Sequence, residues 1–229
     1  GKVSELLDAG AAEYTPIEED IWQEFKQRLL NLLADVNLNK IDHIFGQVLA
    51  DYPPALAADY LITPVLASLE HPVFGNSLKK NLLENRLIEI LLSLSYRQRA
   101  QGQQKSVAIV QLAGGVDMLR NVLLHHSLLM NQIKSEQLGA ILPDEVILAT
   151  EQLQLDALII FNDNTHSLAE FNRQLISLAE KLSLPIIVGG FLSTSLLPKL
   201  PAHVAIAREP DLQTLLQQLD CGLSTSAAS

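Results

Sequence analysis

Two neighbouring histidines, His125 and His126, are the side chains in this sequence best suited to ligate a metal centre. They fall in a stretch predicted to be helical, where adjacent side chains point about 100° apart. One metal ion is therefore not easily held by both imidazoles. The pattern favours ordinary histidines on a helix surface or at an interface, and it leaves ligation by one of them as an alternative.

Glycine pairs and short polar residues follow several of the apolar runs in the second half of the chain. These residues are Gly114 and Gly115, Asn162 to Thr165, and Gly189 and Gly190. Glycine lets a backbone approach a ligand closely, and Asn164 or Thr165 could cap a following helix. We expect Asn162 or Asp163 to be available for a ligand.

Most catalytic patterns are missing from the sequence. No Gly-x-Gly-x-x-Gly follows the first apolar run, and there is no phosphate-cradling loop and no recognisable nucleophile turn. Cys221 is the only cysteine, which excludes an internal disulfide and a cysteine-based zinc site. Gln111 and Leu112 end the first run where a phospho-receiver domain needs acidic residues. We therefore expect no enzyme activity, no catalytic residues and no metal site.

Five short apolar runs alternate with helical patterns and must position these residues. The runs cover residues 107–112, 132–138, 157–161, 185–188 and 203–207. This alternation predicts βαβ units and a doubly wound, flavodoxin-like (Rossmann-like) parallel sheet of five strands in the order 2-1-3-4-5. A ligand of such a sheet binds outside the carboxyl ends of the strands.

The first half of the chain is predicted to be a bundle of four helices. Its apolar residues recur with helical spacing, and Pro53 and Pro54 end the second helix. Pro64 predicts a kink in the third helix. The sequence divides into a linker over 1–17, a helical bundle over 18–101, an α/β domain over 106–221 and a disordered tail over 222–229.

The composition restricts the partners of the chain. The net charge of the 229 residues is −10, both halves are acidic, and no cluster of Lys and Arg could neutralise phosphates. Strong binding of DNA or of an anionic membrane by this stretch is not expected. No apolar run is long enough to span a bilayer. The sequence predicts a cytoplasmic protein.

Three stretches resemble families that combine such a bundle with such a sheet. Residues 1–7, Gly-Lys-Val-Ser-Glu-Leu-Leu, resemble the end of a MerR-type DNA-binding domain. Residues 138–143, Leu-Gly-Ala-Ile-Leu-Pro, and residues 185–190, Pro-Ile-Ile-Val-Gly-Gly, are similar to stretches of cobalamin-binding domains. The whole resembles the C-terminal regulatory region of MerR-family transcription regulators, of the kind that activate curli and biofilm formation. The resemblance implies that a DNA-binding domain precedes Gly1.

The sequence departs from the cobalamin-binding pattern at its chemically important positions. The family's Asp-x-His-x-x-Gly motif falls on residues 116–121, where Met118 replaces the cobalt-ligating histidine and Asn121 replaces a glycine beside the nucleotide tail. Asn162 stands where the family has serine. Phe74 and Glu84 match the aromatic residue and the glutamate that contact the upper corrin face in photosensory regulators, and Tyr60 begins a second possible register.

These departures suggest a degenerate ligand crevice lined by Phe74, Glu84, Gly114, Gly115, Met118, Asn162, Gly189 and Gly190. We expect an effector-sensing and oligomerisation region without a bound cofactor, forming a homodimer or higher homo-oligomer, that reaches promoter DNA only through the preceding domain and does not contact membranes. Two alternatives remain. One is a tetrapyrrole sensor, with cobalamin or with haem ligated by His125 or His126. The other is a corrinoid-dependent methyl-transfer subunit.

Overall fold

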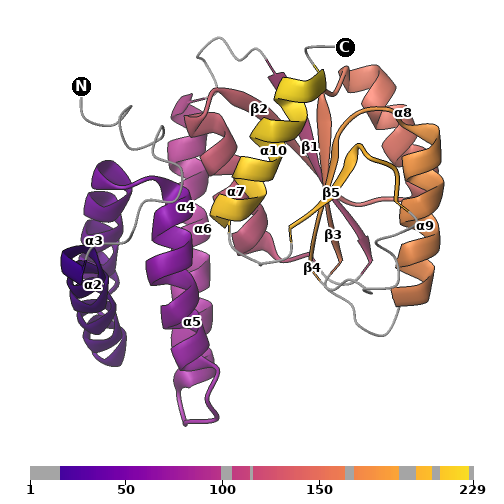
Figure 1. The fold of residues 1–229 in the computed structure, drawn as a ribbon. Helices are drawn as coiled ribbons and strands as arrows, with labels where there is room; N and C mark the ends of the chain where they lie inside the picture. Colours follow the sequence, from indigo (N-terminus) through magenta and orange to yellow (C-terminus); the bar gives the residue numbers. More distant parts are fainter. Residues whose placement is uncertain are drawn as a thin grey trace.

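A computed structural model describes residues 16–98, 105–113, 116–162, 168–190, 200–207 and 212–226. The first part is helical and the second part is a five-stranded sheet with helices on both faces, as the sequence predicts (Figure 1). The helical elements of the first part are α2 (Pro16–Ala34), α3 (Leu38–Asp51), α4 (Pro54–Ala57), η1 (Ala58–Ile62), α5 (Thr63–Leu69) and α6 (Asn76–Gln98).

The third predicted helix contains a wider turn rather than a simple kink. It consists of α4, the π-helical turn η1 and α5, which follow one another without a break. Pro64 explains this, because proline has no N–H to donate and its ring collides with the carbonyl of the residue four positions earlier, Tyr60. A π-helical turn just before the proline relieves that collision and keeps the helix continuous.

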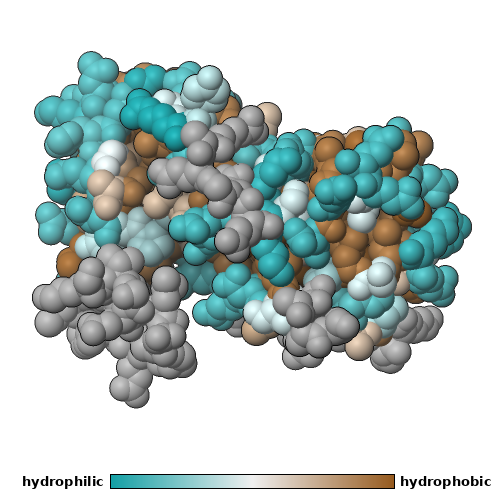
Figure 2. Space-filling model, turned by 90° about the horizontal axis from the view of Figure 1, so that it is seen from above, coloured by the Kyte–Doolittle hydropathy of each residue, from teal (hydrophilic) through white to brown (hydrophobic). Residues whose placement is uncertain are grey.

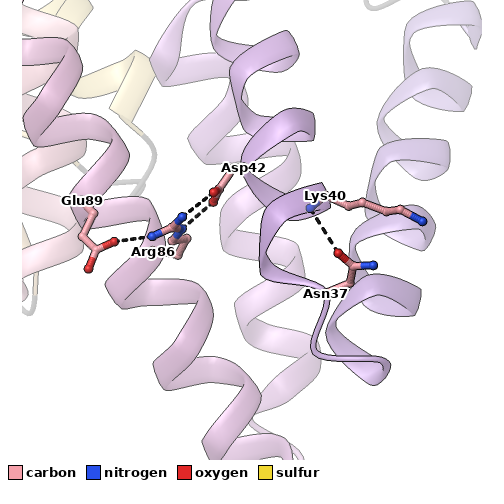
Figure 3. A network of polar contacts seen from close by, with 5 residues as sticks. All are labelled: Asn37, Lys40, Asp42, Arg86 and Glu89. Carbon is pink, nitrogen blue, oxygen red and sulfur yellow. Dashed lines mark hydrogen bonds and ion pairs between the residues drawn. The ribbon is translucent and has the colours of Figure 1, made fainter.

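The bundle is closed by apolar packing and by one ion-pair network. Leu29, Phe45, Leu61 and Leu87 are fully buried and come from four different helical elements. Arg86 of α6 donates hydrogen bonds to both carboxylate oxygens of Asp42 of α3 and a third to Glu89 (Figure 3). A fork of this kind fixes orientation as well as distance, and it sets α3 against α6.

The sheet has the strand order β2-β1-β3-β4-β5, and every pair of neighbours is parallel. The strands are β1 (Lys105–Ala113), β2 (Ile133–Ala140), β3 (Ala157–Asn162), β4 (Ile186–Gly190) and β5 (Val204–Ile206). The helices are α7 (Met118–Met130), α8 (Pro143–Leu153), α9 (Leu168–Lys181) and α10 (Leu212–Ser226). The order predicted from the sequence is therefore confirmed.

The two faces of the sheet bury different partners. One face packs against α8 and α9, and its core includes Val146 and Phe171. The other face packs against α7 and α10, and its core continues without interruption into the helical bundle. Helix α7 lies between the bundle and the sheet (Figure 1). All its residues from Asn121 to Leu129 are buried, as expected for a helix covered on every side.

A carboxylate of the bundle caps the last helix of the α/β part. Asp59 of η1 accepts hydrogen bonds from the backbone N–H groups of Leu212 (3.0 Å) and Gln213 (3.2 Å). These donors have no partner inside α10, and a negative charge is favourable at a helix N-terminus. Asp59 therefore ties the bundle to α10 across about 150 residues of sequence.

The ends of two helices differ from the expected boundaries. Helix α10 continues to Ser226, so residues 222–226 are helical rather than part of a disordered tail. Leu223 explains the extension, because its side chain is buried in the core. Helix α2 begins at Pro16, inside the expected linker, and proline is well suited to a first helical position. The remaining linker residues, 1–15, lie outside the described part of the chain.

The surface is mixed. Seen from above, hydrophilic residues cover much of the bundle, while hydrophobic residues gather over part of the α/β half (Figure 2). Within the described residues, none of the helices has the length and apolar character needed to cross a membrane.

Candidate functional site

The carboxyl ends of β1 and β3 form the topological switch point of the sheet, where ligands of this architecture bind. Two polar side chains are buried there, Gln111 (1% exposed) on β1 and Asn162 (0% exposed) on β3. Gln111 is the register partner of Phe161, and Ala113 is the partner of Asn162. Buried amides need hydrogen-bond partners. The carboxyl end of the sheet therefore contains buried polar groups as well as apolar ones.

Three groups are stacked on one another beside these amides. The Phe161 ring lies so close to Gly189 of β4 that a Cβ placed on this glycine would stand 2.6 Å from the ring. The Arg120 guanidinium of α7 lies over Phe161, with Cζ 3.8 Å from the ring centroid, which is a cation–π contact. Arg120 also donates to the Gln111 side chain at 3.4 Å. The stack fills the space between α7 and the strand ends.

The first turn of α7 stands at the mouth of this region. The Asp117 side chain caps the helix by accepting from the backbone N–H of Arg120 at 2.9 Å. The side chains of Val116 (44%) and Met118 (51%) are exposed, although both are apolar. Asn121 is buried (3%), and its Oδ1 has no hydrogen-bond partner among the described residues. The first turn of α7 therefore presents apolar side chains to solvent, while Asn121 is enclosed on its inner side.

The bundle extends past the carboxyl ends of the strands (Figure 1). This overhang is formed by α5, the turn after it and the start of α6. Phe74 in the turn is fully exposed, and Val73 (61%) and Leu78 (60%) are exposed as well. Exposed apolar side chains therefore occur both on this overhang and at the first turn of α7.

A small charge network at the end of α5 and on α6 lies within electrostatic range of Asp117, the N-cap of α7. Lys80 of α6 donates to Glu70 at 2.8 Å and lies 4.0 Å from Glu84. The hydrogen bond from Lys80 lowers the pKa of Glu70, and the bond to Glu70 raises the pKa of Lys80. Partial burial raises the pKa of Glu84, and the negative charge of Asp117 adds to this effect. Glu84 is thus close enough to α7 to respond to its capping residue.

The two histidines are buried rather than exposed, and they face different partners. His125 Nδ1 lies 2.5 Å from Ser135 Oγ on β2, and His126 Nδ1 lies 3.1 Å from Ser95 Oγ on α6. The structure therefore supports the interface interpretation over the surface one. Burial, together with the neighbouring His125, lowers the pKa of His126 to about 4. Both rings are used in holding α7 between the bundle and the sheet.

The predicted crevice residues are only partly assembled. Met118, Asn162 and Gly189 lie at the strand ends, while Glu84 and Phe74 lie on the bundle beside them. Tyr60, the alternative to Phe74, instead stacks on Trp22 of α2, with ring centroids 6.1 Å apart, and is 37% exposed. Gly190 ends β4. Gly114, Gly115 and residues 163–167 lie outside the described residues.

Sequence reasoning did not find the Arg120–Phe161 stack. Its only signal in the sequence is that Phe161 is the last apolar residue of the third run. Only strand register places that ring beside Gly189. No group of three or more His, Cys, Asp or Glu side chains suited to a metal ion occurs in the described ranges.

The chain is similar to known proteins in its structure rather than in its sequence. No family model and no curated protein sequence matches the chain. The monomethylamine corrinoid protein of Methanosarcina barkeri superposes with a TM-score of 0.62 at 15% identity, over 87% of this chain and 99% of that one. The chain has the fold of a corrinoid protein. This likeness extends over the bundle and the sheet together.

Two further solved structures match with lower scores. A cobalamin-binding protein from Desulfitobacterium hafniense DCB-2 has a TM-score of 0.42 at 15% identity, over 84% of this chain and 97% of that one. The methanol:cobalamin methyltransferase complex of M. barkeri has a TM-score of 0.44 at 16% identity, over 100% and 93%.

The match to the monomethylamine corrinoid protein corrects the expectation that no cofactor is involved. That expectation rested on the substituted positions, among them Met118, Asn121 and Asn162, whereas a solved structure that shares this fold is described as a corrinoid protein. The described residues fit such a group only in part. The exposed apolar side chains suit the flat ring of a corrinoid, but the buried Asn121 stands where the related pattern has a glycine beside the nucleotide tail.

Proposed function

We propose that this chain is the ligand-responsive regulatory region of a MerR-type transcription regulator, and that its ligand is a flat tetrapyrrole macrocycle. The macrocycle binds where the end of the bundle overhangs the strand ends. The resemblance of residues 1–7 and of the sheet motifs supports the regulator assignment. The shared fold with a corrinoid protein supports the class of ligand.

One observation carries the proposal, namely the exposed apolar side chains on both sides of the strand ends. Phe74 and Leu78 stand on the bundle side, and Val116 and Met118 stand on the α7 side. Covering apolar surface stabilises a complex by about 25 cal/mol per Å². A flat ring of large area uses such scattered side chains better than a small polar metabolite would.

We propose sensing rather than catalysis. Met118 occupies the position where the related pattern has an imidazole, and its thioether is not a displaceable base that could support methyl shuttling. Ligand binding would change the packing of the bundle against the α/β part through α7. In a homodimer, this change would alter the relative orientation of the two attached DNA-binding domains. The acidic chain itself leaves DNA contacts to a MerR-type DNA-binding domain.

Absorbance between 300 and 700 nm tests the ligand class. The purified chain is mixed separately with haemin, aquacobinamide and hydroxocobalamin, and excess ligand is removed by gel filtration. We expect stoichiometric retention of at least one of the three chromophores. A chain that stays colourless after all three would overturn the tetrapyrrole assignment.

A pair of variants on one helical hairpin locates the site. Phe74→Ala should weaken retention by about tenfold, the usual range for losing one large apolar contact. Tyr96→Ala is the matched control, because Tyr96 is also aromatic and exposed (80%) but lies at the other end of α6. Equal losses in both variants would mean that the ligand does not bind at the overhang.

Gel-shift experiments test the regulator assignment. The chain joined to its MerR-type DNA-binding domain should shift promoter DNA, and residues 1–229 alone should not. Tight, sequence-specific DNA binding by residues 1–229 would contradict the assignment.

A corrinoid-carrying methyl-transfer subunit is the second candidate, and the fold shared with a monomethylamine corrinoid protein supports it. This candidate predicts that the chain accepts a methyl group from a methylated amine when a partner methyltransferase and a reduced corrinoid are present. Met118→His should then raise the rate, because it restores the imidazole. No methyl transfer by either protein would exclude the candidate.

A further inference from the structure

The space between α7 and the strand ends is closed by the side chains of the chain itself. Phe161 is 3% exposed and lies against the backbone of Gly189, its register partner in β4. The Arg120 guanidinium lies over the same ring, with Cζ 3.8 Å from its centroid, and reaches Gln111, which is 1% exposed. The ring is thus in contact with Arg120 and packs closely on Gly189, and it is almost completely shielded from water.

These contacts hold the stack in place from three elements. The ring comes from β3, the glycine from β4 and the guanidinium from α7. A cation is attracted to an aromatic face more strongly when the pair is shielded from water. The main-chain hydrogen bond from the Ala207 N–H to Val188 O, 2.9 Å long, extends the ladder beside Gly189. Opening this space therefore requires the loss of several contacts at once.

We infer that the Phe161–Arg120 stack makes the site selective for tetrapyrroles without a nucleotide tail. The inference rests on the proposed tetrapyrrole site. A complete cobalamin carries a nucleotide on a tether from the ring edge. When its base is off the cobalt, the nucleotide must be housed in the protein, and the stack occupies the space beside α7. When its base is on the cobalt, the nucleotide stands under the ring and separates it from Val116 and Met118.

Both arrangements reduce the contact between complete cobalamin and the chain. A tail-free corrinoid such as cobinamide, or a porphyrin such as haem, has no such group and can lie flat on the exposed apolar side chains at the first turn of α7. Steric discrimination of this kind is typically worth a factor of 10 to about 200 in affinity. The buried Asn121 adds to the crowding on the same helix.

Equilibrium dialysis with aquacobinamide and hydroxocobalamin tests the inference, because these two probes share one ring and differ in the nucleotide. The full chain should bind aquacobinamide about tenfold or more tightly than hydroxocobalamin. Phe161→Leu and Arg120→Gln should each raise the affinity for hydroxocobalamin and leave that for aquacobinamide within about twofold.

Phe171→Leu is the control for truncating a buried phenylalanine. Phe171 is also fully buried in the α/β part, but it packs on the opposite face of the sheet. Phe171→Leu should leave the ratio of the affinities for aquacobinamide and hydroxocobalamin unchanged. Retained aquacobinamide binding shows that each variant is folded.

The outcomes separate this inference from the proposed function. Equal binding of both corrinoids by the unmodified chain, or an unchanged ratio in Phe161→Leu and Arg120→Gln, would overturn the selectivity and leave the tetrapyrrole site intact. Failure to bind either corrinoid, with haemin also rejected, would overturn both.

Discussion

Ser95 of α6 and His126 of α7 meet across the boundary between the bundle and the α/β part, with Oγ 3.1 Å from Nδ1. Both side chains are almost completely buried, at 2% and 3% exposure. The neighbouring ring of His125 points to Ser135 of β2 instead. Two adjacent histidines thus connect α7 to the bundle on one side and to the edge strand on the other.

The first prediction concerns pH. The pKa of His126 is lowered to about 4 in the folded chain, mainly by burial, against an ordinary value of 6.5. The unfolded chain therefore binds the proton more readily, and the free energy of unfolding should fall as the pH drops from about 6.5 towards 4. Above pH 7 this group should add no pH dependence. The full loss is about 3 kcal/mol.

Urea unfolding between pH 4.5 and 7.5 measures this effect. His126→Gln should flatten the pH dependence in that window, whereas His43→Gln should not, because His43 is exposed on α3. An equal slope in the His126→Gln variant and the unmodified chain would show that another group controls acid stability.

The second prediction concerns the close contact at the strand ends. Gly189→Ala places a Cβ 2.6 Å from Phe161 Cε1, and the resulting overpacking should destabilise the chain by about 1–3 kcal/mol. Adding Phe161→Leu to Gly189→Ala should recover part of this loss. In Gly46→Ala the new Cβ meets no atom within 4 Å, so the same change in helix α3 should instead stabilise by roughly 0.5–1 kcal/mol.

Denaturant unfolding of Gly189→Ala, Phe161→Leu, the double variant and Gly46→Ala checks this prediction. Two single changes that add independently to the double variant would contradict direct contact between residues 161 and 189.

The third prediction concerns the cap of α10. Asp59→Asn removes the negative charge and one of the two equivalent acceptors for Leu212 and Gln213, and it should cost about 1 kcal/mol. Hydrogen exchange at those two amides should accelerate more than exchange elsewhere in the chain. Asp35→Asn is the control, since Asp35 is exposed after the end of α2. Unchanged exchange at the start of α10 would refute the capping role.

The fourth prediction concerns His125, the other histidine of the pair. Ser135→Ala removes the hydroxyl that lies 2.5 Å from His125 Nδ1 in a buried position, which should destabilise the chain by about 1–3 kcal/mol. Ser93→Ala, on the exposed face of α6, should change the stability by less than about 0.5 kcal/mol. Thermal unfolding of both variants at pH 7 compares them directly. Equal melting temperatures would contradict a stabilising role for the buried contact.

Much of the fold could be predicted because local pattern and fold agree. The five runs became β1 to β5 in the expected order. The central strand β3 is buried at every residue, which explains its continuous apolar run. The helical boundaries followed Asn37, Pro53 and the glycine-containing turn before α6. The end of α10 could not be predicted from small and polar residues, because burial of Leu223 decides it.

The candidate site was less predictable. Residues after the strand ends had to lie near one another, because parallel strands end at a common edge. That Phe74 is fully exposed, and Tyr60 stacked on Trp22, depends on how the helices pack. The expectation of no cofactor was wrong because it gave the substituted positions, among them Met118, Asn121 and Asn162, more weight than the fold shared with a corrinoid protein.

The sequence by itself determined the order of elements, the acidic charge and the loss of the imidazole at Met118, since these depend on composition and on spacing along the chain. Only the tertiary structure decided that α7 is buried on all sides, that its histidines face opposite partners, and that Arg120, Phe161 and Gly189 stack together. These relationships join residues far apart in the chain. Side-chain volume and strand register set them, and neither leaves a local signature in the sequence.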